Sequence, residues 1–209
     1  MKDEIKQIFT KYNLEYDENK IEQLVKFYEF VIEKNKVMNL TNIVNEKEFI
    51  LKNILDSVLP EKYIKQNSSL IDVGAGAGFP SVPLKILRPD LNITMLDSLN
   101  KRVVFLNEVI SVLNLKNIQA VHSRAEDYAK NQRESYDVCV SRAVARLNTL
   151  LEYCLPLVKV GGIFIAYKSL KADEEIIESE KALDILGGNI ENKQNVICLL
   201  YTSDAADEL

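Results

Sequence analysis

The fold of this 209-residue chain is decided by one stretch, Ile71-Asp72-Val73-Gly74-Ala75-Gly76-Ala77-Gly78-Phe79-Pro80. Its first residues end a predicted buried strand, and three glycines in five residues form the turn that follows. Glycine lets the backbone bend sharply and come close to a ligand. Ligands in open α/β sheets bind outside the carboxyl ends of the strands, where this turn is expected to lie. We therefore predict that the turn binds a nucleotide-like ligand.

Beyond the turn, short β-rich runs alternate with segments of helical length. The runs fall at residues 70–73, 92–96, 118–121, 136–141 and 162–167. Alternation of this kind is typical of a doubly wound α/β sheet with parallel strands.

Helical spacing of apolar residues dominates the chain before this sheet. One buried helix face repeats from Asp17 to Lys36, and another from Glu46 to Val58. We therefore predict an N-terminal helical extension over residues 1–65 and a ligand-binding domain over residues 66–199. Residues 200–209 carry neither a strand period nor a helix cap, so we expect an unstructured or non-native tail.

Cysteine spacing and hydropathy exclude several classes of protein. Cys139, Cys154 and Cys198 are widely separated and form no CxxC pair. This spacing argues against a disulfide framework or a metal site and favours a cytoplasmic protein. No apolar run is long enough to span a membrane, and the N-terminus has no secretory signal, so we expect no membrane partner.

The net charge of −5 is distributed unevenly along the chain. Residues 74–171 contain 13 basic and 8 acidic side chains, whereas residues 172–209 contain 2 basic and 10 acidic ones. The basic middle leaves an anionic partner open, although solvated surface charges would give the same count. If the middle binds RNA, we expect the acidic C-terminal segment to lie away from the RNA face.

A second acidic residue follows the next predicted strand. Asp97 lies 23 residues beyond Gly74, where a carboxylate can accept both hydroxyls of a ribose. The turn has G-x-G-x-G spacing instead of the dinucleotide fingerprint G-x-G-x-x-G, but the acid alone fits NAD equally well. The alternative role for Asp97 is to cap the helix that begins near Asn100.

These residues resemble a known family. Residues 72–80 are similar to motif I of class I S-adenosylmethionine methyltransferases, and residues 20 to 199 resemble the RsmG (glucose-inhibited division protein B) family, which methylates guanine N7 in 16S rRNA. Other motifs occur in the family's order: Met38-Asn39-Leu40-Thr41, Ile54-Leu55-Asp56-Ser57, Leu96-Asp97-Ser98, Ser123-Arg124-Ala125-Glu126 and Ser141-Arg142-Ala143. The resemblance implies a Rossmann-like methyltransferase sheet, S-adenosyl-L-methionine as cofactor, and a monomer acting on 16S rRNA or the small ribosomal particle.

The resemblance also implies a set of cofactor contacts: Gly74, Gly76, Phe79, Asp97, Ala125, Glu126 and Arg142. The turn residues would line the methionine and sulfonium side, and Asp97 would hold the ribose. Ala125 and Glu126 would flank the adenine, although Glu126 could equally be a surface acid. Arg142 would lie between cofactor and substrate, and a buried structural ion pair is its alternative role.

Substrate binding is expected on basic residues that lie near the predicted strand ends: Arg102, Arg124, Arg142, Arg146, Lys168 and Lys171. Among them, Arg142, Arg146 and Lys168 are the principal candidates. Phosphate contacts would supply affinity, and an RNA loop stacked on an aromatic ring would supply specificity. Phe79 and Tyr167 are candidates for stacking, although either could belong to the core.

Methyl transfer to guanine N7 needs no general base. The nitrogen carries an in-plane lone pair and no proton, so the enzyme has only to align the reacting atoms, which can supply roughly 7–11 kcal/mol. We therefore expect no catalytic acid or base, and we interpret the single histidine, His122, as a structural residue.

Other functions share parts of this pattern. A methyltransferase for a small molecule or a protein would use the same cofactor residues. An NAD(P)-dependent oxidoreductase would need the third glycine spacing and a Tyr-x-x-x-Lys pair, and a non-enzymatic RNA-binding module would not need the glycine turn. The chain departs from the family at Asn53, where His is usual, at Ser169, where Gly is usual, and in its last strand, expected at residues 195–199.

Overall fold

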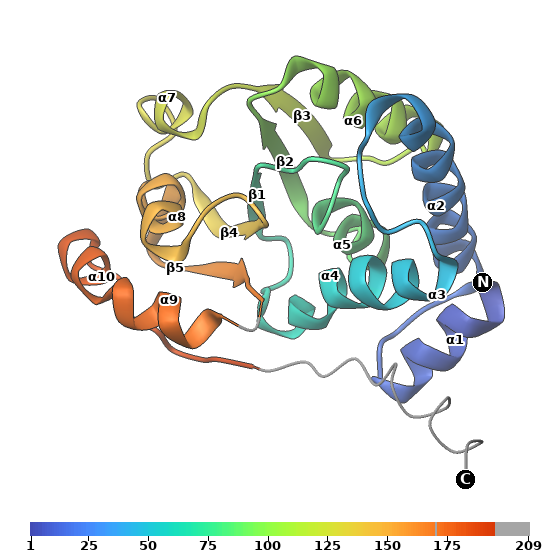
Figure 1. The fold of residues 1–209 in the computed structure, drawn as a ribbon, viewed down its shortest axis with the longest axis horizontal. Helices are drawn as coiled ribbons and strands as arrows, with labels where there is room; N and C mark the ends of the chain where they lie inside the picture. The colour runs from blue at the N-terminus through green and yellow to red at the C-terminus, as the bar shows by residue number, and fades with distance from the viewer. Residues whose placement is uncertain (170, 195–209) are drawn as a thin grey trace, which may run out of the picture.

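A computed structural model of the chain describes residues 1–169 and 171–194. Five parallel strands form one sheet in the order β3-β2-β1-β4-β5 (Figure 1). The strands are β1 (Ser69–Val73), β2 (Asn92–Asp97), β3 (Ile118–His122), β4 (Tyr136–Arg142) and β5 (Val158–Tyr167). The chain order reverses at β1, because the next strands lie on one side of it and the later strands on the other. The expected Rossmann-like α/β class is confirmed.

Helices cover both faces of this sheet. They are α5 (Ser81–Leu87), α6 (Asn100–Val112), α7 (Ala125–Ala129), α8 (Leu147–Cys154) and the 3-10 turn η3 (Leu155–Leu157). Two further helices, α9 (Ala172–Glu178) and α10 (Glu180–Leu186), pack on α8. Leu70 and Val138 pack with α5 and α6, whereas Ile71 and Cys139 pack with α7 and α8. The central strands are therefore buried on both faces, which explains their almost wholly apolar sequences. The sequence pattern did not predict α9 and α10.

The N-terminal segment is helical throughout most of its length. Its elements are α1 (Lys2–Lys11), α2 (Glu18–Met38), α3 (Glu46–Phe49), the π-helix η1 (Ile50–Leu55), α4 (Asp56–Val58) and the 3-10 helix η2 (Leu59–Tyr63). The second predicted helix, 46–58, is present, but its middle is a π-helix, in which the N–H of Asp56 donates to the carbonyl of Leu51. Apolar spacing over a few residues does not distinguish a π turn from an α turn.

The extension and the sheet share one hydrophobic core. Phe27 of α2 and Phe49 of α3 are fully buried, and their ring centroids lie 5.2 and 5.5 Å from that of Phe79, which follows the glycine turn. Burial of each such side chain stabilises the fold by about 1.5–3 kcal/mol. The extension thus packs as part of the same folded body, and the division between residues 65 and 66 remains a prediction.

Two expectations are not covered by this description. The expected strand at 195–199 and the tail at 200–209 lie outside the described residues. Within the described part of the chain, no helix combines the length and the apolar character needed to cross a membrane.

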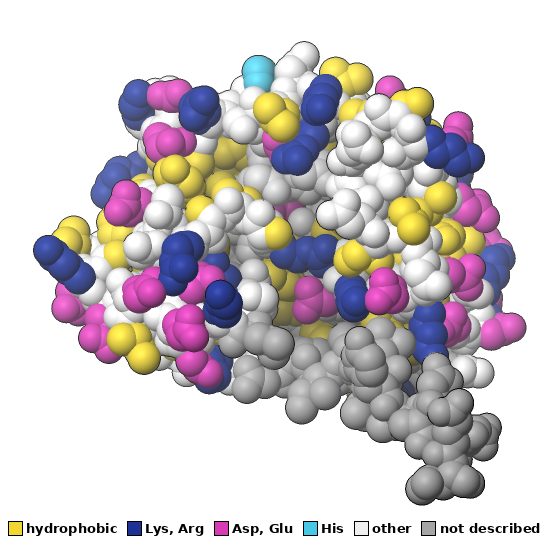
Figure 2. All heavy atoms as spheres, viewed as in Figure 1, with side chains coloured by type: hydrophobic (Ala, Val, Ile, Leu, Met, Phe, Trp, Pro, Cys, Tyr) yellow, Lys and Arg dark blue, Asp and Glu magenta, His cyan; other side chains and the backbone are white. Residues whose placement is uncertain are grey.

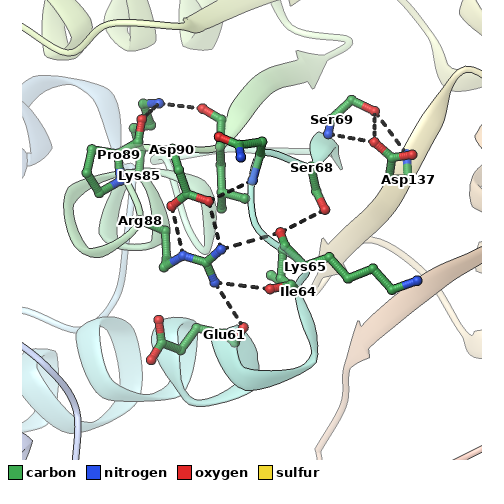
Figure 3. Close-up of polar contacts among 12 residues, drawn as sticks. Glu61, Ile64, Lys65, Ser68, Ser69, Lys85, Arg88, Pro89, Asp90 and Asp137 are labelled. Carbon is green, nitrogen blue, oxygen red and sulfur yellow. Dashed lines mark hydrogen bonds and ion pairs between the residues drawn. The ribbon is translucent and has the colours of Figure 1, made fainter.

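A polar network ties the end of the extension to the amino-terminal edge of the sheet (Figure 3). Arg88 donates to the carbonyl of Ile64 at 3.1 Å, and its Nε and Nη2 each lie 2.8 Å from a carboxylate oxygen of Asp90. The hydrogen bonds from Arg88 lower the pKa of Asp90 to about 2. Nearby, Asp137 accepts from both the N–H and the hydroxyl of Ser69, which fixes the start of β1 against β4.

We predict that Asp90→Asn lowers the free energy of unfolding at pH 7 by about 2 kcal/mol, the stabilisation implied by a pKa lowered from 3.8 to about 2. The pKa is lower in the folded state, so this stabilisation is present above about pH 4 and is lost as the pH falls toward 2. In urea titrations, the difference in the free energy of unfolding between variant and parent should be smaller at pH 3 than at pH 7. Asp127→Asn, which removes an exposed pair with Lys130, should change stability little at either pH. An equal loss for Asp90→Asn at both pH values would contradict the assignment.

Candidate cofactor site and substrate face

The glycine turn after β1 has a backbone that other residues rarely adopt. Gly74, Gly76 and Gly78 have φ angles of +79°, +57° and +90°, in the region that favours glycine. A Cβ added at Gly74 would also lie 2.3 Å from Cγ2 of Val144. Both the backbone angle and the available space therefore require glycine at this position.

Asp97, at the end of β2, is joined to this turn. Its side chain is buried, and its Oδ2 accepts the N–H of Gly76 at 2.9 Å. Its Oδ1 accepts the N–H of Leu99 at 2.9 Å, just before α6, but the N-cap residue of α6 is Leu99, without a side-chain cap, so Asp97 does not have the alternative capping role. An ionised carboxylate has about four acceptor positions, so these bonds leave room for ribose hydroxyls. Asp97 can therefore fix the turn and the approach to α6 and still bind a ribose.

A cavity lies over the carboxyl ends of β1, β2 and β3. Its lining residues are Val73, Gly74, Leu96, Asp97, Ser98, Ser123, Arg124, Ala125, Glu126, Val144 and Tyr153. Four of the predicted cofactor residues are among them: Gly74, Asp97, Ala125 and Glu126. The other three do not line it: Gly76, Phe79 and Arg142. The face drawn in Figure 2 is hollowed near its centre, between the α8 side and the α2 side of Figure 1.

Two lining residues, Val144 and Tyr153, lie outside every motif that the sequence analysis singled out. Val144 follows Ala143, whose left-handed φ of +56° belongs to the turn that brings the Val144 side chain over Gly74. Tyr153 comes from α8, at a distance in sequence from every motif. Neither an alanine in a left-handed conformation nor a tyrosine on an amphipathic helix indicates a binding site in the sequence.

Arg142, at the end of β4, is bound by the extension. Its Nη1 donates to the carbonyl of Lys52 at 2.8 Å, and its Nη2 donates to Oδ1 of Asn53 at 2.5 Å. A carboxylate oxygen of Asp56 lies 3.4 Å from Nη1, and the guanidinium carbon lies 5.4 Å from the centroid of the Phe79 ring. Burial lowers the pKa of Arg142, and the nearby carboxylate of Asp56 opposes that shift.

The two candidate stacking residues lie in the core. Phe79 is only 6% exposed within its aromatic cluster, which agrees with the core alternative. Tyr167 packs against the core, and its hydroxyl donates to the carbonyl of Ser57 at 2.8 Å. Burial raises the pKa of Tyr167 well above its usual range. For both residues the core alternative describes the structure.

Two of the three principal candidates for substrate binding, Arg146 and Lys168, are paired with acidic residues of α9. Arg146 forms an ion pair with Glu178. Lys168 lies 2.6 Å from Glu175 and donates to the carbonyl of Ala145, in the loop after β4. The expectation that the acidic segment lies away from this face is wrong, because α9 packs on α8 and Glu175 accepts the first backbone N–H of α8. Figure 2 shows acidic and basic side chains intermixed where Figure 1 places α9.

The remaining basic candidates lie around the same edge of the sheet. Arg124 lines the cavity, and Arg102 lies 3.5 Å from Asp97. Lys171 is exposed just before α9. His122 is exposed at the end of β3, with Nε2 3.0 Å from the carbonyl of Ser98. Within the described ranges, no group of His, Cys, Asp and Glu side chains is arranged to hold a metal ion.

Comparison with known proteins shows which family the chain belongs to. A family model described as GidB, rRNA small subunit methyltransferase G, matches residues 20–198. The chain belongs to this family. The expected family, the enzyme class of S-adenosylmethionine-dependent methyltransferases and the cofactor S-adenosyl-L-methionine are thereby confirmed.

Individual relatives cover most of the chain. Ribosomal RNA small subunit methyltransferase G of Staphylococcus epidermidis is 51% identical over 180 residues, which are 85% of this chain and 75% of that protein. The protein of the same name from Alkaliphilus oremlandii is 48% identical over 194 residues, 91% of this chain and 81% of that protein. The crystal structure of M. jannaschii TYW2 in complex with AdoMet is 17% identical, with a TM-score of 0.57, and covers 70% of this chain and 66% of that chain. The last likeness shows the fold alone.

We predict that Gly74→Ala weakens S-adenosylmethionine binding at least tenfold in calorimetric titration, because its Cβ would enter the space at the turn and collide with Val144. Gly161→Ala is the matched control, since Gly161 has a similar φ of +77° and its Cβ would meet nothing within 4 Å. The control should lose stability through its backbone alone and keep its affinity. An unchanged affinity for S-adenosylmethionine in Gly74→Ala would show that the cofactor does not bind at this turn.

Proposed function

We propose that the protein transfers the methyl group of S-adenosylmethionine to N7 of a guanine in small-subunit (16S) rRNA. The observation that carries the proposal is the family match over residues 20–198, which contains the whole candidate site. We further propose that it acts as a cytoplasmic monomer on 16S rRNA or on the small ribosomal particle.

The residues around the cavity fit the proposed cofactor. Gly74 lines the cavity without a side chain, and a Cβ there would collide with Val144, another lining residue. Asp97 is fixed beside this turn with acceptor positions for a ribose. Ala125 and Glu126 line the cavity at the start of α7 and would flank an adenine. When bound, S-adenosylmethionine supplies an electrophilic methyl group on a sulfonium sulfur.

One buried carboxylate supports the same assignment. Asp72 directly precedes the turn, accepts a 2.7 Å hydrogen bond from the hydroxyl of Ser81 through Oδ2, and has no partner for Oδ1 among the described residues. Burial raises its pKa to about 7. An orphaned acceptor of this kind is costly unless a donor arrives, and the ammonium group of the cofactor is such a donor.

The contribution of the chain to the reaction is positioning. Guanine N7 attacks without losing a proton, so no side chain has to act as a base. Arg142 is held by contacts with the extension and would orient the substrate. Arg146 is half exposed and would contact a phosphate when Glu178 releases it. Lys168 is largely buried, so its role toward the substrate requires release from Glu175, and in the free protein it supports the loop after β4.

The proposed function is tested by methyl transfer from labelled S-adenosylmethionine to unmethylated 16S rRNA and to small ribosomal subunits lacking the modification. We expect label in one of these substrates, at a guanine that borohydride reduction and aniline cleave, as they do at 7-methylguanosine. Label in protein or in small molecules with none in rRNA would instead favour a methyltransferase of another substrate class.

We predict that Glu178→Gln raises RNA affinity about two- to fivefold at low salt, because it releases Arg146 from an exposed ion pair. Asp173→Asn removes the same charge from the same helix but breaks a pair with Lys193 instead, so it should change the affinity less. Arg146→Ala should weaken binding and flatten the dependence of log affinity on log salt by about 0.7. Equal gains from the two acidic variants would show that only total charge matters.

A further inference from the structure

We propose that Asn53, in the π-helix η1 of the extension, is a positioning residue for methyl transfer that fixes the guanidinium of Arg142 at the carboxyl end of β4. The inference rests on the proposed function, because Arg142 is there assigned to orient the substrate. It makes the N-terminal extension part of the active site.

The first support is the unusual state of the Asn53 side chain. It is fully buried, and its Oδ1 accepts from Nη2 of Arg142 at 2.5 Å. Its Nδ2 has no hydrogen-bond partner among the described residues. A buried amide with an unpartnered donor is less favourable for folding than an apolar side chain of similar volume. Packing therefore does not explain an amide here, whereas its bond to Arg142 does.

The second support is the way in which η1 presents its groups. The N–H of Asp56 bonds to the carbonyl five residues earlier, that of Leu51, as in a π-helix. Along this widened turn, the carbonyl of Lys52 and the side chain of Asn53 both reach Arg142, one at each terminal nitrogen. Single π turns occur often at functional sites, where they redirect groups that an α-helix would point elsewhere.

The third support is that the guanidinium of Arg142 is contacted on several sides. The guanidinium has the Phe79 ring beside it and acceptors from η1 at Nη1 and Nη2, with a carboxylate of Asp56 near Nη1. Its side chain is still 20% exposed, so part of it remains accessible to solvent. Asn53 itself is inaccessible, so it acts through Arg142 and not on the substrate.

The variants that test this role separate the acceptor of Asn53 from its donor. Asn53→Leu has a similar volume and loses both groups, whereas Asn53→Asp keeps the acceptor and loses the donor that has no partner. Gln23→Leu is the matched control, because it also removes an amide of the extension, one that donates to the carbonyl of Leu113 at 3.2 Å, far along the chain from β4.

We expect Asn53→Leu to lower kcat for 16S rRNA at least tenfold, with KM for RNA and the calorimetric Kd for S-adenosylmethionine within about threefold of the parent. Asn53→Asp should restore kcat to within about threefold, and Gln23→Leu should leave it unchanged. In an Arg142→Ala background, Asn53→Leu should cause no further loss, because its effect passes through Arg142. Should Asn53→Leu fail to fold, Asn53→Ser, which is too short to reach Arg142, replaces it in every arm.

Three results would overturn the inference: an unchanged kcat in Asn53→Leu, an equal defect in Asn53→Asp, or a further loss in the Arg142→Ala background. The parent protein is measured first under the same conditions. A parent that transfers no methyl group to rRNA contradicts the proposed function, whereas an active parent with an equally active Asn53→Leu contradicts this inference alone.

Discussion

The hydrogen bond from the N–H of Gly76 to the buried carboxylate of Asp97 joins the turn after β1 to the end of β2. Because the strand order reverses at β1, this bond lies at the point where neighbouring connections leave the sheet in different directions. It holds the turn in the left-handed conformation that only glycine tolerates well. It also sets Asp97 beside Gly74, on the wall of the cavity. The position of the cofactor site follows from this constraint.

The N-terminal extension holds residues at both ends of the sheet in place. Its aromatic side chains pack around Phe79, and its π-helix binds Arg142. Residues before β1 therefore fix both Phe79, after the glycine turn, and Arg142, at the end of β4. The amino-terminal edge of the sheet is tied to the same segment through Arg88. Two attachments at opposite edges of the sheet make the extension a rigid support, which suits an enzyme whose contribution is alignment.

Local patterns predicted the parts of this structure that depend on neighbouring residues. Strands at 92–96 and 118–121 were placed within one residue of β2 and β3, because buried parallel strands are short apolar runs between turn signals. The acid at Asp97 was found because it follows a strand end at a set distance from the turn. Each of these features depends only on residues that lie within about 25 positions of one another in the sequence.

Features that depend on tertiary packing were not predicted. Glu178 pairs with Arg146 across 32 residues, and nothing in either local sequence indicates that α9 folds back onto α8. An aromatic residue after a glycine turn can face a ligand or the core, and only the presence of α2 and α3 decides that Phe79 is buried. The π turn that aims Asn53 has the same apolar spacing as an ordinary helix.

A crystal structure with S-adenosylhomocysteine bound tests the central claim most directly. The account predicts ribose hydroxyls within hydrogen-bond distance of Asp97, the adenine beside Ala125 and Glu126, and Arg142 still bound by Asn53. A ligand bound away from the glycine turn, or an Asp97 carboxylate that contacts only Gly76 and Leu99, would contradict it.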